Sequence, residues 1–126
     1  MKEVMAVIRM NKINQTKKAL TDAGISSMHA RECLGRGKGL VDLEVLKGAE
    51  QGFEEAVALL GNTQRLIPKR MISIVVPDKL VQRTVAALIK CNRTGKAGDG
   101  KIFVMPVSDT VRIRTGESGD ETLDEV

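Results

Sequence analysis

Apolar residues recur along this chain at two spacings, which predict five strands and two helices outside a long connection that is described below. Residues 4–8 form a short apolar run that ends at Arg9, a pattern typical of a strand buried on both faces. Residues 13–23 place small and apolar side chains at helical spacing, and Gly24 follows as a stop signal. The predicted strands are 4–8, 26–34, 71–76, 102–107 and a short 110–114, and the predicted helices are 13–23 and a segment that begins at Pro77 and Asp78.

Without the short last strand, these elements follow the order strand, helix, strand, strand, helix, strand. This order predicts an α+β protein with the ferredoxin-like βαββαβ arrangement, in which two helices cover one face of an antiparallel sheet. The length of 126 residues fits one domain with a single core. We expect residues 1–116 to form that domain and residues 117–126 to form an acidic, flexible tail.

The connection between the second and third predicted strands is unusually long. It covers residues 36–68, and connections of this length in a compact domain are usually functional or disordered. Within it, residues 49–60 have the pattern of an amphipathic helix that ends at Gly61 and Asn62. This helix either packs on its own domain or changes its order when a ligand binds. We favour the second interpretation, because long loops often carry function.

Charge is distributed unevenly along the chain. The formal net charge is +4, but the last ten residues hold five of the 16 acidic residues and none of the 20 basic ones. Residues 1–116 therefore carry a formal charge of +9, which suits the binding of an anion. A basic nucleic-acid-binding module is an alternative. It is disfavoured, because the chain has no Trp or Tyr and only two Phe to stack on bases.

Composition also bears on the compartment and on metal binding. No apolar run approaches the ~18 residues that a membrane-spanning helix needs, and the N-terminus lacks a secretory pattern, so we expect a cytoplasmic protein without stable membrane association. Cys33 and Cys91 lie far apart, and His29 is the only histidine. Neither a disulfide framework nor a zinc site is predicted.

Two glycine-rich segments carry the candidate chemistry. They are residues 35–39, with the sequence GRGKG, and residues 94–101, with the sequence TGKAGDGK. Glycines allow backbone N–H groups to approach phosphate oxygens closely, and neighbouring Lys and Arg side chains neutralise the phosphate charge. Arg112 and Arg114 alternate on the last predicted strand and would point the same way. Together these groups predict a triphosphate site, although either glycine segment alone would be read as a turn.

Catalytic motifs are absent from the sequence. Residues 95–101 match the beginning of a P-loop, but Ile102 follows where a Ser or Thr would bind magnesium, and the segment leads into a strand and not a helix. The single histidine has no convincing Ser or Cys partner, and the carboxylates are not spaced for two metals. We therefore expect a binding protein and not an enzyme.

The segments TGKAGDGKIFV, at 94–104, and VRIRTGE, at 111–117, closely resemble the PII signal-transduction proteins. The resemblance extends to the first strand and helix, to residues 35–37 and to residues 67–69. It implies a trimer with ATP or ADP in the clefts between subunits, and 2-oxoglutarate beside the ATP through a magnesium ion. Family members usually have a Gln directly after the Gly-Arg of the strand exit, where this chain has Gly37.

The resemblance also implies a set of site residues. One subunit would contribute its glycine segments and the adenine-side strand, its neighbour would contribute two arginines, and Lys69 would hold a carboxylate of 2-oxoglutarate. Backbone amides after the strand exit would replace the missing Gln. The implied residues are Gly35, Arg36, Gly37, Lys38, Gly39, Lys69, Ser73, Val75, Gly98, Asp99, Gly100 and Lys101, with Arg112 and Arg114 from the neighbour.

The long loop and the GRGKG strand exit resemble the nitrogenase-associated branch of the family, in particular the longer-looped member of an archaeal tandem pair. This implies a nitrogen-status sensor that inhibits dinitrogenase, in a homomeric trimer or in one mixed with a paired subunit. The alternatives are a PII regulator of another target, such as glutamine synthetase or an ammonium channel. A channel would receive a thin loop tip, and the predicted 49–60 helix is bulky for that purpose.

Overall fold

The structure is a computed structural model, and it describes residues 1–37 and 66–124. Its strands are β1 (Lys2–Arg9), β2 (His29–Gly35), β3 (Ile67–Val76) and β4 (Lys101–Pro106). Its α-helices are α1 (Ile13–Asp22) and α4 (Val81–Asn92), and its short 3₁₀ helices are η1 (Met10–Lys12), η2 (Asp78–Leu80) and η3 (Asp120–Thr122).

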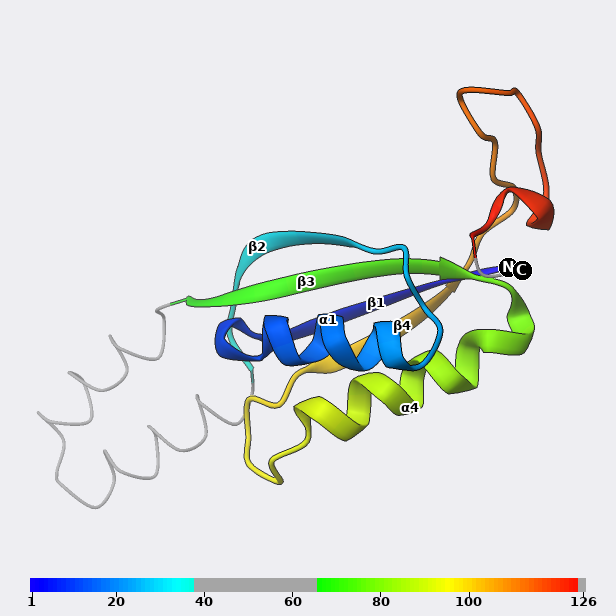
Figure 1. The fold of residues 1–126 in the computed structure, drawn as a ribbon. Coiled ribbons are helices and arrows are strands. Elements are labelled where there is room, and N and C mark those ends of the chain that lie inside the picture. The colour runs from blue at the N-terminus through cyan, green and yellow to red at the C-terminus, as the bar shows by residue number, and fades with distance from the viewer. Residues whose placement is uncertain (38–65, 125–126) are drawn as a thin grey trace, which may run out of the picture.

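The four strands form one antiparallel sheet in the order β2-β3-β1-β4. Both α-helices lie on the same face of this sheet (Figure 1). The predicted α+β, ferredoxin-like arrangement is confirmed. The two helices predicted at 13–23 and from Pro77 onward are present, and each of the first four predicted strands is present with shifted ends.

The core lies between the sheet and the two helices. Strand β1 alternates, with Val4, Ala6 and Ile8 buried toward the helices and Met5 and Val7 only partly buried on the other face. The sequence pattern predicted that this strand is buried on both faces. In a single chain, the described residues bury only the face toward the helices fully, so this prediction is wrong. The sheet face away from the helices keeps an exposed side chain, Phe103, which is 45% exposed.

Two buried threonines at the contact between the helices donate hydrogen bonds to backbone carbonyl groups of the preceding turn. Thr16 donates to the carbonyl oxygen of Lys12 at 2.7 Å, and Thr84 donates to that of Leu80 at 2.8 Å. Both side chains are fully buried. A buried hydroxyl without a partner would destabilise the fold, so these local bonds allow α1 and α4 to pack closely.

The predicted fifth strand, 110–114, is wrong. Among the described residues, its ladder contacts are limited to an isolated bridge between Val111 and Ser118, and residues 113–115 form a turn. The amide of Gly116 donates to the carbonyl oxygen of Arg112 at 2.7 Å, and the amide of Arg112 donates to that of Glu117 at 2.8 Å. The chain therefore reverses within residues 110–119, which we call the arginine hairpin.

Three other boundaries differ from prediction. Strand β2 begins at His29 and not at residue 26, and β3 begins at Ile67, so the long connection is shorter than 36–68. The acidic segment after Gly116 was predicted to be a flexible tail. It packs on the domain as far as Asp124, with Thr122 and Leu123 each only 9% exposed. The predicted 49–60 helix lies outside the described residues.

Candidate functional site

A cleft of about 490 Å³ opens at the end of the sheet where the long connection begins and ends. The register of the sheet forms it: Arg9 lies opposite Lys69, and Gly35 lies opposite Ile67, so the ends of three strands meet here. Residues 97 and 98, from the second glycine segment, complete the wall. The lining residues are Arg9, Met10, Asn11, Gly35, Gly37, Ile67, Pro68, Lys69, Ala97 and Gly98.

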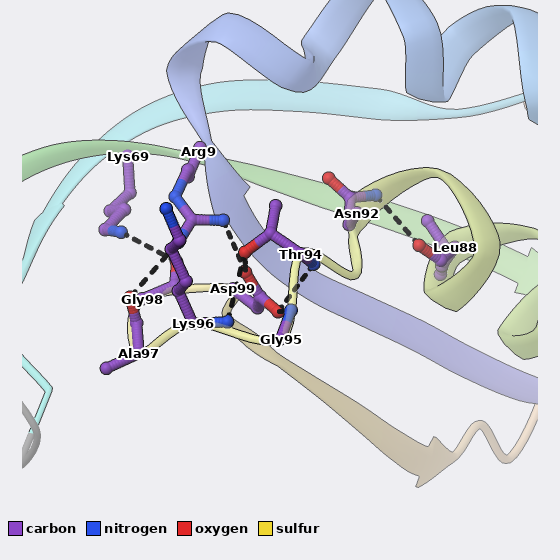
Figure 2. A network of polar contacts seen from close by, with 10 residues as sticks. All are labelled: Arg9, Lys69, Leu88, Asn92, Thr94, Gly95, Lys96, Ala97, Gly98 and Asp99. Carbon is purple, nitrogen blue, oxygen red and sulfur yellow. Dashed lines mark hydrogen bonds and ion pairs between the residues drawn. The ribbon is translucent and has the colours of Figure 1, made fainter.

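Two cationic side chains reach this cleft. The ammonium group of Lys69 donates to the carbonyl oxygen of Gly98 at 3.2 Å, and the Nη2 atom of Arg9 donates to that of Ala97 at 3.1 Å (Figure 2). Both carbonyl groups are neutral acceptors, so the bond to Gly98 does not cancel the positive charge of Lys69, whereas the Arg9 guanidinium also forms an ion pair with Asp99. A cleft with two cations at its wall is suited to an anionic ligand.

Sequence reasoning predicted Lys69 but missed Arg9. Arg9 ends the first apolar run and looks like an ordinary strand-terminating residue. Its role depends on the antiparallel register that sets it directly opposite Lys69, and this register involves residues sixty positions apart. Arg9 could have been identified as a cleft residue only if the pairing of β1 with β3 had been known.

The second glycine segment is organised around the Asp99 carboxylate. It accepts bonds from the Thr94 amide at 2.8 Å, the Thr94 hydroxyl at 2.5 Å and the Gly95 amide at 3.0 Å. The Nη1 atom of Arg9 lies 2.5 Å from it as well. The Thr94 hydroxyl bond, with the Arg9 guanidinium next in importance, holds the pKa of Asp99 well below its usual range.

Glycine is required at two positions of this segment. Gly98 and Gly100 have φ values of +98° and +104°, in the region that side-chain-bearing residues avoid. A Cβ atom on Gly100 would lie 1.8 Å from the carbonyl oxygen of Val7, and one on Gly98 would lie 3.3 Å from the Nη2 atom of Arg9. The segment is therefore pressed against the end of β1 and against the cleft cations.

Other predicted site residues do not line this cleft. Ser73 and Val75 project from β3 on the sheet face away from the helices, and Ser73 donates to a Glu3 carboxylate oxygen at 2.5 Å. Lys101 begins β4, opposite Val7 of β1. Arg36 follows β2 and is exposed. The predicted contacts Lys38 and Gly39 lie outside the described residues.

The two predicted arginines lie at the opposite end of the sheet, on the arginine hairpin (Figure 1). Arg112 is within 3.4 Å of the Glu117 carboxylate of the same hairpin, and Arg114 is exposed. In a single chain they are not brought together with the glycine segments. The apolar tip residue Ile113 is completely exposed.

Residues 1–117 match a family model described as "Nitrogen regulatory protein P-II". The chain belongs to this family. The resemblance found in the glycine and arginine segments is thereby confirmed. Members of the P-II family are regulators, and the chain is accordingly a nitrogen regulatory protein.

Curated relatives of this P-II protein come from archaea and bacteria. The "Nitrogen fixation nifHD region GlnB-like protein 2" of Methanobacterium ivanovii is 46% identical over 125 residues, which cover 98% of this chain and 99% of the relative. The protein of the same name from Methanothermococcus thermolithotrophicus is 44% identical over 130 residues, covering 95% and 96%. The "Nitrogen regulatory protein P-II" of Azospirillum brasilense is 37% identical over 123 residues, covering 98% and 100%.

The described residues were predicted to lack a zinc site and a membrane-spanning helix. Residues 1–37 and 66–124 contain no group of three or more His, Cys, Asp or Glu side chains arranged to hold a metal ion. No helix in the same part of the chain is long and apolar enough to cross a membrane.

Proposed function

We propose that this P-II protein senses nitrogen status by binding ATP or ADP together with 2-oxoglutarate, and that it inhibits dinitrogenase through its long connection. The observation that carries the proposal is the cleft itself. It lies at the base of that connection, and its wall carries Arg9 and Lys69 beside the second glycine segment. A ligand in this position contacts the two ends of the segment that would have to move.

The phosphate groups would lie against the glycine segments. Gly98 and Gly100 adopt positive φ values, a backbone geometry that turns successive N–H groups toward an anion, and Lys101 adds a cation beside them. The exit from β2, with Gly35, Arg36 and Gly37, would close the other side, while Ser73 and Val75 would flank the base. Lys38 and Gly39 complete the proposed contacts.

The dicarboxylate would use the cleft cations. Lys69 would offer charge-assisted hydrogen bonds to an anion held between the glycine segments, and its neighbour across the β1–β3 ladder, Arg9, would hold the second segment through Ala97 and Asp99. Magnesium would enter with the ATP. Phosphate and 2-oxoglutarate oxygens would supply ligands to it.

A trimer, homomeric or mixed with a paired P-II subunit, would complete each site. The arginine hairpin cannot reach the glycine segments of its own chain, because the two lie at opposite ends of the sheet (Figure 1). Arg112 and Arg114 of a neighbouring subunit would supply the missing cations. The sheet face away from the helices, with its exposed Phe103, is the surface available for packing between subunits.

Dinitrogenase is the proposed target because relatives with about this chain's length bear names that refer to a nitrogen-fixation region. Glutamine synthetase or an ammonium channel are the alternatives, because some relatives are named only as nitrogen regulatory proteins, without a target. In either case, the ligand acts only to the extent that it binds one state of the long connection more tightly than another.

Calorimetric titration tests the ligand part of the proposal. ATP should bind first, and 2-oxoglutarate should then bind in the presence of ATP and magnesium. Lys69→Gln should weaken the binding of 2-oxoglutarate at least about ten-fold. Lys79 is an exposed lysine on η2, and Lys79→Gln should leave the affinity for 2-oxoglutarate unchanged. If millimolar ATP gives no heat of binding, the proposal is refuted.

An activity assay tests the target. Purified dinitrogenase should lose substrate reduction when the P-II protein is added, and 2-oxoglutarate with ATP should restore it. If inhibition is absent while ATP and 2-oxoglutarate bind, dinitrogenase is not the target and the alternatives take its place.

A further inference from the structure

The Asp99 carboxylate is surrounded by donors from its own chain. Its two oxygens accept from the Thr94 amide, the Thr94 hydroxyl, the Gly95 amide and the Arg9 guanidinium (Figure 2). A carboxylate has about four lone-pair positions, so these four donors use its accepting capacity. A phosphate group brought against it would also be repelled, because both groups are anionic.

We propose that Asp99 is a positioning residue that does not contact the nucleotide, and that Thr94 and Arg9 are the groups through which it acts. The three side chains, which we call the loop clamp, fix residues 94–101 in the shape that presents the amides of Gly98 and Gly100 to an anion. This inference rests on the proposed nucleotide function. It changes the role of Asp99, which the sequence places among the ligand contacts.

The clamp ties three parts of the molecule together. Thr94 follows α4, Arg9 ends β1, and Asp99 lies between the two glycines that precede β4. The Thr94 hydroxyl also accepts from the Lys96 amide at 3.2 Å, which joins the first half of the segment to the same cluster. The segment is therefore held at both ends by side chains before a ligand arrives.

Such a clamp strengthens binding by reducing the entropy lost when the ligand binds. A glycine-rich segment has a large conformational entropy when it is free, and ordering it at the moment of binding weakens the affinity. The clamp orders the segment when the protein folds. Its effect should therefore be confined to ligands that use the amides of the segment.

Two isosteric variants separate positioning from direct contact. Asp99→Asn removes the charge that holds Arg9, and Thr94→Val removes the hydroxyl group. Each should weaken ATP binding roughly ten-fold and leave the much weaker binding of adenosine unchanged. Because both act on one cluster, the double variant should lose little more than the worse single variant. Asp120→Asn, an exposed carboxylate on η3, is the matched control.

Hydrogen exchange on the nucleotide-free protein provides a readout that needs no ligand. Amides of residues 94–101 should exchange faster in both clamp variants, while those in the β1–β3 ladder should not change. The positioning role is overturned if exchange stays at the wild-type rate, or if Asp99→Asn weakens ATP while Thr94→Val has no effect. A wild-type protein that binds no ATP refutes the proposed function instead, so the two failures are distinguishable.

Discussion

Individual residues at the cleft carry more structural constraint than their sequence pattern reveals. Glycines in residues 94–101 were predicted to let backbone amides approach phosphates, and this use stays a prediction. The structure gives Gly100 another reason: its φ is +104°, and its Cα faces the carbonyl oxygen of Val7. The motif indicates that small residues are needed here. The structure adds the reason, because a side chain at Gly100 would collide with the backbone at the end of β1.

Gly100→Ala should therefore destabilise the fold even without any ligand. The added Cβ would lie 1.8 Å from a backbone oxygen and would force a disfavoured φ, so the loss should be about 1–3 kcal/mol or more. Urea unfolding measures it. Gly37→Ala is the matched control, because its Cβ would meet no atom of the described residues within 4 Å. Equal unfolding midpoints for the two variants would contradict the close contact at Val7.

The Asp99 carboxylate should also set an acid dependence. Its pKa is lowered by the Thr94 hydroxyl and Arg9, so its stabilising effect is complete above about pH 4, the ordinary value for Asp, and is lost as the pH falls through the lowered value. The difference in unfolding free energy between wild type and Asp99→Asn should be constant from pH 7 to pH 4 and shrink below. A difference that already shrinks between pH 7 and pH 5 would contradict this assignment.

At the scale of elements, local periodicity predicted the existence of two helices and four strands but not every buried face. Helical spacing alone is compatible with both Leu88 and Ile89 on the inner face of the second helix. The structure buries Leu88 to 1% exposure and leaves Ile89 37% exposed, because the face of α4 is set by the sheet and by α1. Spacing alone cannot locate the edge of an apolar stripe to one residue.

The pair gives a direct test of the helix–sheet core. Leu88→Ala should lower the unfolding free energy by about 2–5 kcal/mol, because it leaves a cavity under α4. Ile89→Ala should cost less than half as much, since part of its side chain is already in water. Chemical denaturation of both variants measures the difference. If the two losses are equal, the orientation of α4 in the structure is contradicted.

The fifth strand shows where local reasoning fails. Residues 110–114 alternate like a strand, but the bonds that decide their shape come from Gly116 and Glu117, outside that window. The same alternation fits a hairpin that reverses immediately afterwards. The clamp was missed for a similar reason, because Arg9 and Asp99 lie ninety positions apart in sequence and meet only through the sheet.

At the scale of the whole molecule, the residues of the proposed site are divided between two ends of the sheet. The cleft cations and glycine segments gather at one end of the sheet, and the arginine hairpin lies at the other (Figure 1). The resemblance to the P-II family implies that a neighbouring subunit brings them together, because in a single chain the two groups lie far apart. Assembly is therefore the central claim.

Complementation between two defective variants tests this claim most directly. Lys101→Gln removes a cation from the glycine side, and the double variant Arg112→Gln, Arg114→Gln removes those of the hairpin, so each alone should bind ATP poorly. When the two variants are unfolded and refolded together in equal amounts, about a quarter of the interfaces between subunits should combine the intact glycine side of the Arg112→Gln, Arg114→Gln variant with the intact hairpin of the Lys101→Gln variant. ATP binding should return at that fraction of sites, with wild-type affinity. A refolded mixture that binds no better than its separate components would contradict a site shared between subunits.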